Sequence, residues 1–223
     1  TPSEPVVRRK VLHVGCGHAP LPASLPASLW DEVRYDIDPS VRPHVVGSMT
    51  DMGVVADASM DALYSSHNVE HLDAHEVAIA LGEFHRVLKP GGMAWIVVPD
   101  LQCLAERIAA GDLDGELYVS ASGPISVSDV LWGHRASLAA GQHYMAHRCG
   151  FSAATLERKL LDAGFGPVRV ERHLPRRELV AAATKPRSPT TDLDAVFEQA
   201  RQLHNAGCWA EALPLYTAVA QAR

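Results

Sequence analysis

The sequence has few cysteines, no long apolar run and no excess of positive charge. Its four cysteines, at positions 16, 103, 149 and 208, are far apart and form no CxxC pair. This spacing argues against a disulfide framework or a zinc knuckle and favours reduced thiols in a cytoplasmic protein. The longest strongly apolar run, residues 93–98, is far shorter than the roughly 20 residues of a membrane span. No signal-peptide pattern is visible, so we expect no membrane contact.

The net charge and the chain length limit the kinds of partner and the number of domains. A formal net charge of −6 argues against DNA as a partner, because phosphate binding usually requires a basic surface. A local basic patch remains open, so protein and RNA acceptors are not excluded. A chain of 223 residues accommodates one α/β domain and a small extra unit.

Short β-like runs alternate with helical patterns and turns. The expected strands lie at Val11–Val14, Val33–Ile37, Val45–Val46, Ala62–Ser65 and Met93–Val98. This alternation predicts an α/β fold with a mainly parallel, Rossmann-like sheet. The runs Val168–Val170 and Leu179–Ala183 are too close for a parallel crossover, so they predict an antiparallel hairpin at the end of the domain.

Helices are expected to be few on one face of this sheet. Only about six residues separate Asp38 from Val45, too few for a helical crossover, and prolines after Gly17 leave room for one short helix at Ala27–Trp30. The clearest helix follows Asp73, whose spacing from Glu76 predicts a capping box. A second helix is expected from Ser152 to Gly164.

A glycine turn and a later acid form the candidate ligand site. Residues 11–17 (VLHVGCG) form a strand that runs into Gly15 and Gly17, which allow the backbone to approach a ligand closely. Asp38 follows about 20 residues later, where a carboxylate can accept both hydroxyl protons of a ribose. Asp36 is the competing candidate for this role.

Five ordered motifs resemble the class I S-adenosylmethionine-dependent methyltransferases. They are VLHVGCG, YDIDP, VGSMTDM, MDALYSSHNVEHL and EFHRVLKPGGMAWIVVPD, and the resemblance covers about residues 10–183. It implies S-adenosylmethionine as cofactor, with S-adenosylhomocysteine as its product. The residues that the resemblance places at the cofactor are His13, Gly15, Cys16, Gly17, Asp38, Ser48, Met49, Ser66 and His67.

Three positions depart from the family pattern. His13 replaces the usual acid before the glycine turn, Ala19 stands where a third glycine is common, and Ser48 replaces an Asp that often pairs with the adenine amine. Each change removes one cofactor contact, so we expect modest affinity.

The resemblance also implies in-line methyl transfer, which requires a base only if the acceptor arrives protonated. We therefore take His67, His143 and His147 as candidate catalytic residues, and His71 as a structural residue of the loop. His143 and His147 are four residues apart and would share a helix face, but no carboxylate has matching spacing, so we expect no metal.

Residues 100–150 are not explained by the core motifs. The family commonly places substrate-selecting insertions after the fifth strand. Aromatic, imidazole and guanidinium groups in this stretch suggest an acceptor pocket: Tyr118, Trp132, His134, Arg135, His143, Tyr144, His147 and Arg148. A solvated lid is the alternative. We expect a small-molecule or glycan acceptor.

The C-terminal tail differs from the rest of the chain. We predict a methyltransferase domain at 1–184, a linker at 185–192 and a helix pair at 193–223. The tail resembles a tetratricopeptide repeat, with a turn at Ala206-Gly207 and Glu211-Ala212 on the second helix. One unit cannot bury its own face, so either the tail packs on the methyltransferase domain or the native protein continues into further repeats. We expect the second, with a protein partner for the repeats.

Two other functions compete with methyl transfer. The chain could bind the cofactor without catalysis and act as a scaffold module through its helices, an idea that gains from His13 and Ser48. A nicotinamide-dependent enzyme is the weaker alternative, because no GxGxxG is present. A DNA amino-methyltransferase is not expected, since the Asn/Asp/Ser-Pro-Pro-aromatic motif is absent.

Overall fold

The computed structural model describes residues 8–120, 123–187 and 193–222, and divides the chain into two compact units, Thr1–Pro186 and Arg187–Arg223. Most of the predicted linker, residues 188–192, lies outside the described residues. Each unit is described by itself.

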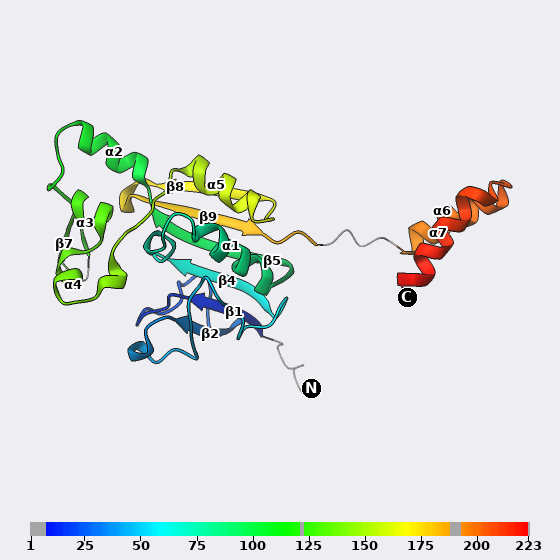
Figure 1. The fold of residues 1–223 in the computed structure, drawn as a ribbon, viewed down its shortest axis with the longest axis horizontal. Helices are drawn as coiled ribbons and strands as arrows, with labels where there is room; N and C mark the ends of the chain where they lie inside the picture. Colours follow the sequence, from blue (N-terminus) through cyan, green and yellow to red (C-terminus); the bar gives the residue numbers. More distant parts are fainter. Residues whose placement is uncertain (1–7, 121–122, 188–192, 223) are drawn as a thin grey trace. The chain divides into compact units, whose positions relative to one another are not determined.

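A seven-stranded sheet forms the centre of the first unit (Figure 1). Its strands are β1 (Arg9–Val14), β2 (Trp30–Asp36), β3 (Val45–Val46), β4 (Met60–Ser66), β5 (Leu88–Pro99), β8 (Val168–His173) and β9 (Glu178–Thr184). The order is β3-β2-β1-β4-β5-β9-β8. β9 pairs antiparallel with β5 and β8, and the other pairs are parallel. The predicted mainly parallel sheet with an antiparallel hairpin is confirmed.

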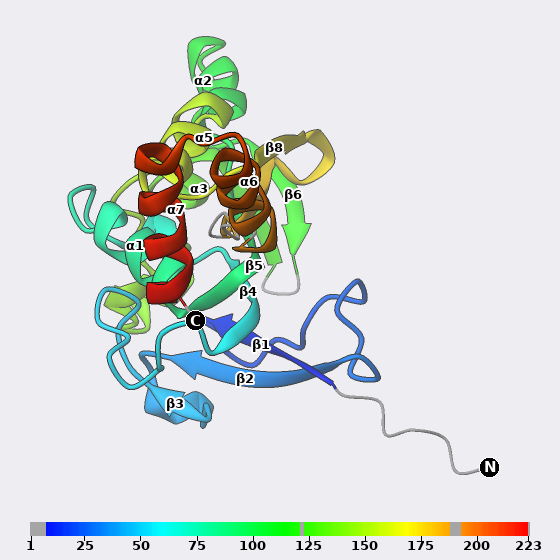
Figure 2. The ribbon, with the colours of Figure 1, turned by 90° about the vertical axis from the view of Figure 1, so that its right-hand side faces the viewer.

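Two helices cover one face of the sheet, as Figure 2 shows: α1 (Val77–Val87) and α5 (Ala153–Asp162). Their apolar sides form the main core with the inward residues of the strands, among them Leu81 and Phe84 of α1 and Leu156 and Leu160 of α5. All four side chains are fully buried. Burial of this kind contributes about 1.5–3 kcal/mol per large side chain.

The opposite face is covered by a loop in place of helices. Val11, Leu25, Trp30 and Ala62 form a small separate cluster there. The prediction of a short helix at Ala27–Trp30 was wrong, because Trp30 already begins β2, where it pairs with Arg9 of β1. A 3-10 turn, η1 (Pro39–Val41), is the one helical element described between β2 and β3.

The predicted capping box at Asp73 forms only in part. The side chain of Glu76 accepts a hydrogen bond from the Asp73 backbone N–H at 3.0 Å. The helix itself begins at Val77, with Glu76 at its N-cap position and no side-chain cap. By contrast, Ser152 caps α5 as expected, through a capping box with Thr155.

Residues 100–150 form a lobe beyond the edge of the sheet toward which β1 and β4 point (Figure 1). The lobe contains α2 (Leu101–Ala109), the hairpin β6 (Glu116–Ser120) and β7 (Gly123–Ser126), α3 (Val127–Trp132), α4 (Arg135–Ala139) and the 3-10 turn η3 (His143–Met145). It has its own small core around Leu104, Ile125 and Val127. The carboxyl ends of parallel strands are where ligands bind in open α/β sheets.

The second unit is a helix pair, α6 (Leu193–Asn205) and α7 (Trp209–Ala222). Ala200 and Ala212 are buried in it, and the ring centroids of Phe197 and Tyr216 lie 5.6 Å apart. Gly207 adopts a φ of +78° at the predicted turn, a value that glycine adopts without strain. No described helix has the length and apolar character needed to cross a membrane.

Candidate functional site

The glycine turn after β1 is shaped by a side chain from the loop that follows β4. Gly15 has a φ of +63°, and a Cβ at this position would lie 2.0 Å from the Asn68 side-chain oxygen. Asn68 itself is held by hydrogen bonds from its Nδ2 to Val14 O at 3.0 Å and Ser66 O at 2.9 Å. Only glycine therefore fits at position 15.

Two side chains of β2 support the same turn. The Gly17 N–H donates to Asp36 Oδ2 at 2.7 Å, and Asp36 Oδ1 accepts from the Asp38 N–H at 2.9 Å. Arg34 donates to Gly17 O at 2.6 Å and to Ala19 O at 3.0 Å. These bonds keep the turn in one conformation before any ligand arrives.

A cavity of about 600 Å³ opens in front of this turn. That volume is typical of cofactor pockets. Eight of the nine predicted cofactor residues line it: Gly15, Cys16, Gly17, Asp38, Ser48, Met49, Ser66 and His67. Asp36 and Asn68 line it too. Gly17 has no atom within 4 Å of where a Cβ would be, so a ligand can approach the backbone there.

His13 is the predicted cofactor residue that does not line the cavity. His13 is 3% exposed, and its Nδ1 lies 2.7 Å from Glu32 Oε1. The centroid of its ring lies 5.3 Å from that of the Tyr64 ring. Burial lowers the pKa of His13, although Glu32 acts in the opposite direction. The histidine that replaces the usual family acid is thus part of the packing behind the turn.

The two candidate carboxylates differ in setting. Asp36 ends β2 and is 8% exposed, next to the glycine turn. Asp38 is half-buried at the N-cap of η1, where it accepts from the Ser40 N–H at 2.8 Å and the Tyr144 hydroxyl at 3.1 Å. Those hydrogen bonds, that from Ser40 foremost, lower the pKa of Asp38.

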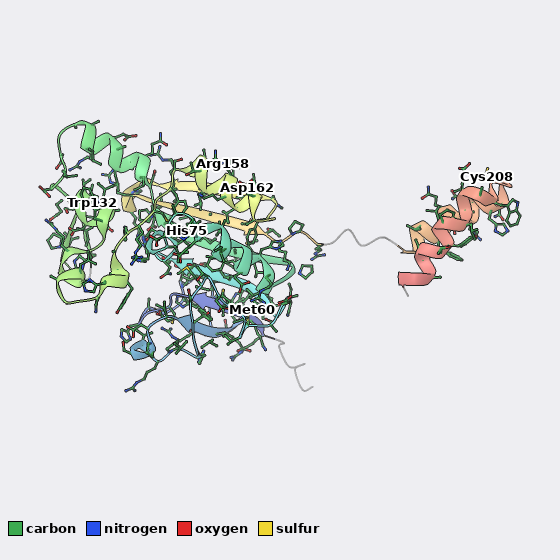
Figure 3. The ribbon with its side chains drawn as sticks, in the orientation of Figure 1. Met60, His75, Trp132, Arg158, Asp162 and Cys208 are labelled. Carbon is green, nitrogen blue, oxygen red and sulfur yellow. The ribbon has the colours of Figure 1, made fainter. Side chains whose placement is uncertain are left out.

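A second cavity, of about 120 Å³, adjoins the first. His67 and Met145 line both. Of the eight residues predicted to form the acceptor pocket, three line the smaller cavity, namely Tyr118, His134 and His147, and two line the larger one, Tyr144 and Arg148. Trp132, in the lobe (Figure 3), and Arg135 line neither.

His67 lies between two carboxylates. Its Nδ1 is 3.3 Å from Glu70 Oε1 and its Nε2 is 3.3 Å from Glu178 Oε2. Burial by itself lowers the pKa of His67, but Glu178 and Glu70 outweigh it and raise the pKa to about 9. The ring is therefore an imidazolium at neutral pH and does not accept a proton there.

His147 has the opposite character. Burial lowers its pKa, so the ring is neutral at pH 7. Its Nδ1 lies 2.7 Å from Val130 O, which makes Nδ1 the protonated nitrogen and leaves a lone pair on Nε2. A neutral imidazole with a free Nε2 can accept a proton.

His143 and His71, the other two histidines considered in the sequence analysis, have different surroundings. His143 belongs to η3, which ends at Met145. The prediction that His143 and His147 share one helix face was therefore wrong. His143 lines neither cavity. Both ring nitrogens of His71 lie 3.1 Å from backbone oxygens, those of Ala146 and His67. His71 thus connects the loop after β4 to the lobe.

One group among the described residues has metal-like spacing: Glu70, His71 and His147. The Glu70 carboxylate is 1% exposed and accepts no hydrogen bond among those residues. Burial by itself raises the pKa of Glu70, but His67 outweighs it and lowers the pKa. Since His71 has both nitrogens against carbonyl oxygens, the group offers two free ligands.

Several residues at the site were missed in the sequence. Asn68 and Arg34 shape the turn. Arg176 and Arg177 line the smaller cavity from the β8–β9 connection, and Glu178, the first residue of β9, contacts His67. The signal was present: a strand antiparallel to its neighbours begins where they end, so its first residues, Glu178 among them, lie at the ligand edge.

Comparison with known proteins agrees with this geometry. Residues 12–96 match a family profile described as a methyltransferase domain. Comparison with curated proteins found no match. A SAM-dependent methyltransferase from Methanosarcina mazei has a similar structure, with 18% identity, a TM-score of 0.56, and coverage of 81% of this chain and 94% of that one.

Two further structures are similar. The 1,6-didemethyltoxoflavin-N1-methyltransferase of Burkholderia thailandensis, solved with 1,6-didemethyltoxoflavin and S-adenosylhomocysteine, has 19% identity and a TM-score of 0.51, covering 80% of this chain and 72% of that one. A Pyrococcus horikoshii protein has 15% identity and a TM-score of 0.53, covering 80% and 82%. Residues 12–96 thus match the profile of a methyltransferase domain, and the first unit shares the fold of these solved structures.

Proposed function

We propose that the first unit is a methyltransferase that moves a methyl group from S-adenosylmethionine to a small-molecule or glycan acceptor by in-line displacement. One observation carries the proposal. The predicted cofactor residues, His13 excepted, line one cavity in front of a rigid glycine turn, and this cavity adjoins a second one at His67 and Met145. A two-substrate reaction needs such a pair of adjoining cavities.

The residues of the larger cavity fit the cofactor. Gly15 and Gly17 leave the backbone open to it, and Ser48 and Met49 lie after β3, where the adenine would be held. We assign the ribose hydroxyls to Asp36 and not to Asp38, because Asp36 lies directly beside the turn at the strand end. A carboxylate has about four acceptor positions, and Asp36 uses two of them within the protein.

When bound, S-adenosylmethionine supplies a methyl group on a positively charged sulfur. The protein contributes chiefly by holding the acceptor in line with that methyl, and such positioning can lower the barrier by about 7–11 kcal/mol. If the nucleophile arrives protonated, we assign His147 Nε2 as the proton acceptor. His67, a cation between Glu70 and Glu178, is then a positioning residue at the boundary of the cavities.

A cofactor-binding scaffold without catalysis is the second candidate. The engagement of His13 with Glu32 favours it, because that side chain is not free to contact a cofactor. The second unit would then supply the interaction surface. We propose that it is a tetratricopeptide-like repeat, supported by the small buried residues Ala200 and Ala212 where its helices cross.

The four cysteines are all free, which supports the proposed cytoplasmic location. The test of function has two steps. Calorimetric titration of the full chain with S-adenosylhomocysteine should show one site, and failure to bind would overturn both candidates. A methyl-transfer screen with radiolabelled S-adenosylmethionine against acceptor fractions then separates them, since a scaffold transfers nothing.

A further inference from the structure

The smaller cavity has the size and walls of a site for a small organic group. Its volume is about 120 Å³, close to the roughly 150 Å³ of a protein cavity that holds a benzene ring. Pro99, Ile125, Val130 and Met145 form apolar walls. One side is different, because two consecutive arginines of the β8–β9 connection, Arg176 and Arg177, line it.

Neither arginine has an ion-pair partner among the described residues. Arg177 donates a hydrogen bond from Nη1 to the Cys103 sulfur at 3.1 Å. A thiol sulfur is a weak acceptor. Its Nε is buried and has no hydrogen-bond partner in the part of the chain that the structure describes. Guanidinium groups in proteins usually satisfy several donors at once, so this pair has unused capacity.

Two carboxylates close to the arginines, Asp129 in the cavity wall and Glu178 next to Arg177, are bonded to other side chains. Asp129 accepts from Arg135 at 2.9 Å and from Ser126 at 2.7 Å. Glu178 is paired with His67 at 3.3 Å and with His173 at 3.4 Å. Neither carboxylate lies within ion-pair distance of Arg176 or Arg177 among the described residues, so both guanidinium groups are available to an anion.

The backbone holds Arg177 in place. Its φ is +57°, in the left-handed region that non-glycine residues rarely adopt. Its N–H donates to Leu174 O at 3.2 Å, and its carbonyl accepts from the Asp100 N–H at 2.8 Å. Strained conformations that the surroundings enforce concentrate at functional sites.

We infer that the smaller cavity takes an acceptor that carries an oxyanion, a carboxylate or a phosphate, on a ring-sized apolar body, and that Arg176 and Arg177 bind this anion. The inference rests on the proposed function, because it treats the cavity as the acceptor side of a methyl-transfer site. The planar forks of two arginines match the paired oxygens of both kinds of anion. The anion then orients the acceptor so that its other end faces His67 and Met145, where the two cavities meet.

The test uses four probes of one shape that differ in charge. Benzoate, phenyl phosphate, neutral benzamide and cationic benzylamine are titrated by calorimetry into the full chain, with and without saturating S-adenosylhomocysteine. We expect benzoate or phenyl phosphate to bind at one site, about tenfold or more tighter than benzamide. The stronger of the two anions identifies the carboxylate or the phosphate as the natural group.

Matched arginine variants locate the site. Arg176→Gln and Arg177→Gln should each weaken the preferred anion about tenfold and leave S-adenosylhomocysteine binding unchanged. Arg176 is exposed, so its variant is expected to fold even if Arg177→Gln does not. The control is Arg158→Gln, on the exposed side of α5 (Figure 3), which should bind all probes as wild type does.

Three results would overturn the inference: tighter binding of benzylamine than of either anion, no binding of either anion, or unchanged anion binding in both Arg176→Gln and Arg177→Gln. These outcomes are separate from failure of the proposed function. Loss of S-adenosylhomocysteine binding would reject the methyltransferase assignment, while the probes titrated without it would still report whether the cavity binds oxyanions.

Discussion

The backbone N–H of Gly17 donates to Asp36 Oδ2 at 2.7 Å, although 19 residues separate the two in the chain. This bond joins the glycine turn after β1 to the end of β2. The same carboxylate also accepts from the Asp38 N–H. Asp36 thus shapes both sides of the place where the cofactor is proposed to bind.

Replacement of the two aspartates should separate their roles. Asp36→Asn removes the charge and retains one acceptor, and we expect it to weaken S-adenosylhomocysteine binding by about tenfold or more, since hydrogen bonds to a charged group contribute about 1.5–3 kcal/mol. Asp38→Asn, whose side chain bonds to Ser40 and Tyr144 and not to the glycine turn, should weaken it less. Calorimetric titration of both variants measures the difference. A larger loss for Asp38→Asn would return the ribose to Asp38.

Gly15→Ala should destabilise the unliganded protein. The new methyl group would collide with the Asn68 amide, and the φ of +63° adds strain, so we expect a loss of about 1–3 kcal/mol in the free energy of unfolding. Gly17→Ala is the matched control: its φ is +46° and its Cβ position is open, which limits the loss to about 1–2 kcal/mol. Denaturant unfolding compares the two. Equal losses would mean that Asn68 yields without cost.

The stability of the protein should depend on pH through His67. Its pKa is about 9 in the folded state and near the ordinary 6.5 when unfolded, so its ion pairs stabilise fully below pH 6.5 and lose their effect as the pH rises through 9. The ring is 44% exposed and therefore screened, so we expect a loss of about 1 kcal/mol.

The measurement is the free energy of unfolding of wild type relative to His67→Gln across this range. His75→Gln, an exposed histidine nearby in the sequence (Figure 3) with no ion pair among the described residues, is the control and should show no such trend. A difference between wild type and His67→Gln that stays constant with pH would contradict the assignment of His67 as a cation.

His147→Gln should slow methyl transfer without loss of cofactor binding. General base catalysis contributes about 10²- to 10⁴-fold, and we expect a decrease of that order in kcat for an acceptor that arrives protonated. Because the pKa of His147 is lowered, wild-type kcat should stay constant down to below pH 6.5. His143→Gln, whose side chain lines neither cavity, should retain activity. Equal rates for the two variants would remove His147 from the proton-transfer step.

The positions of the strands along the chain were predictable because the signals for a strand are local. Apolar runs bounded by turns predicted every strand of the large sheet, and the short gap between the last two predicted the antiparallel hairpin. Errors arose where distant pairing decided the outcome. Trp30 extends β2 because β1 lies beside it, and the segment around His143 and His147 does not continue as one helix, because His147 bonds to Val130 and Trp132.

The local pattern of residues was enough for the sheet, the glycine turn and the identity of most cavity residues, since apolar runs mark the strands and glycine permits the positive φ that such a turn requires. The tertiary structure alone determined the charge states of the histidines and the positive side of the smaller cavity. Those properties depend on which carboxylates and guanidinium groups from remote segments come within a few ångströms of one another, as Glu178 does with His67. Spacing along the chain carries no information about that proximity.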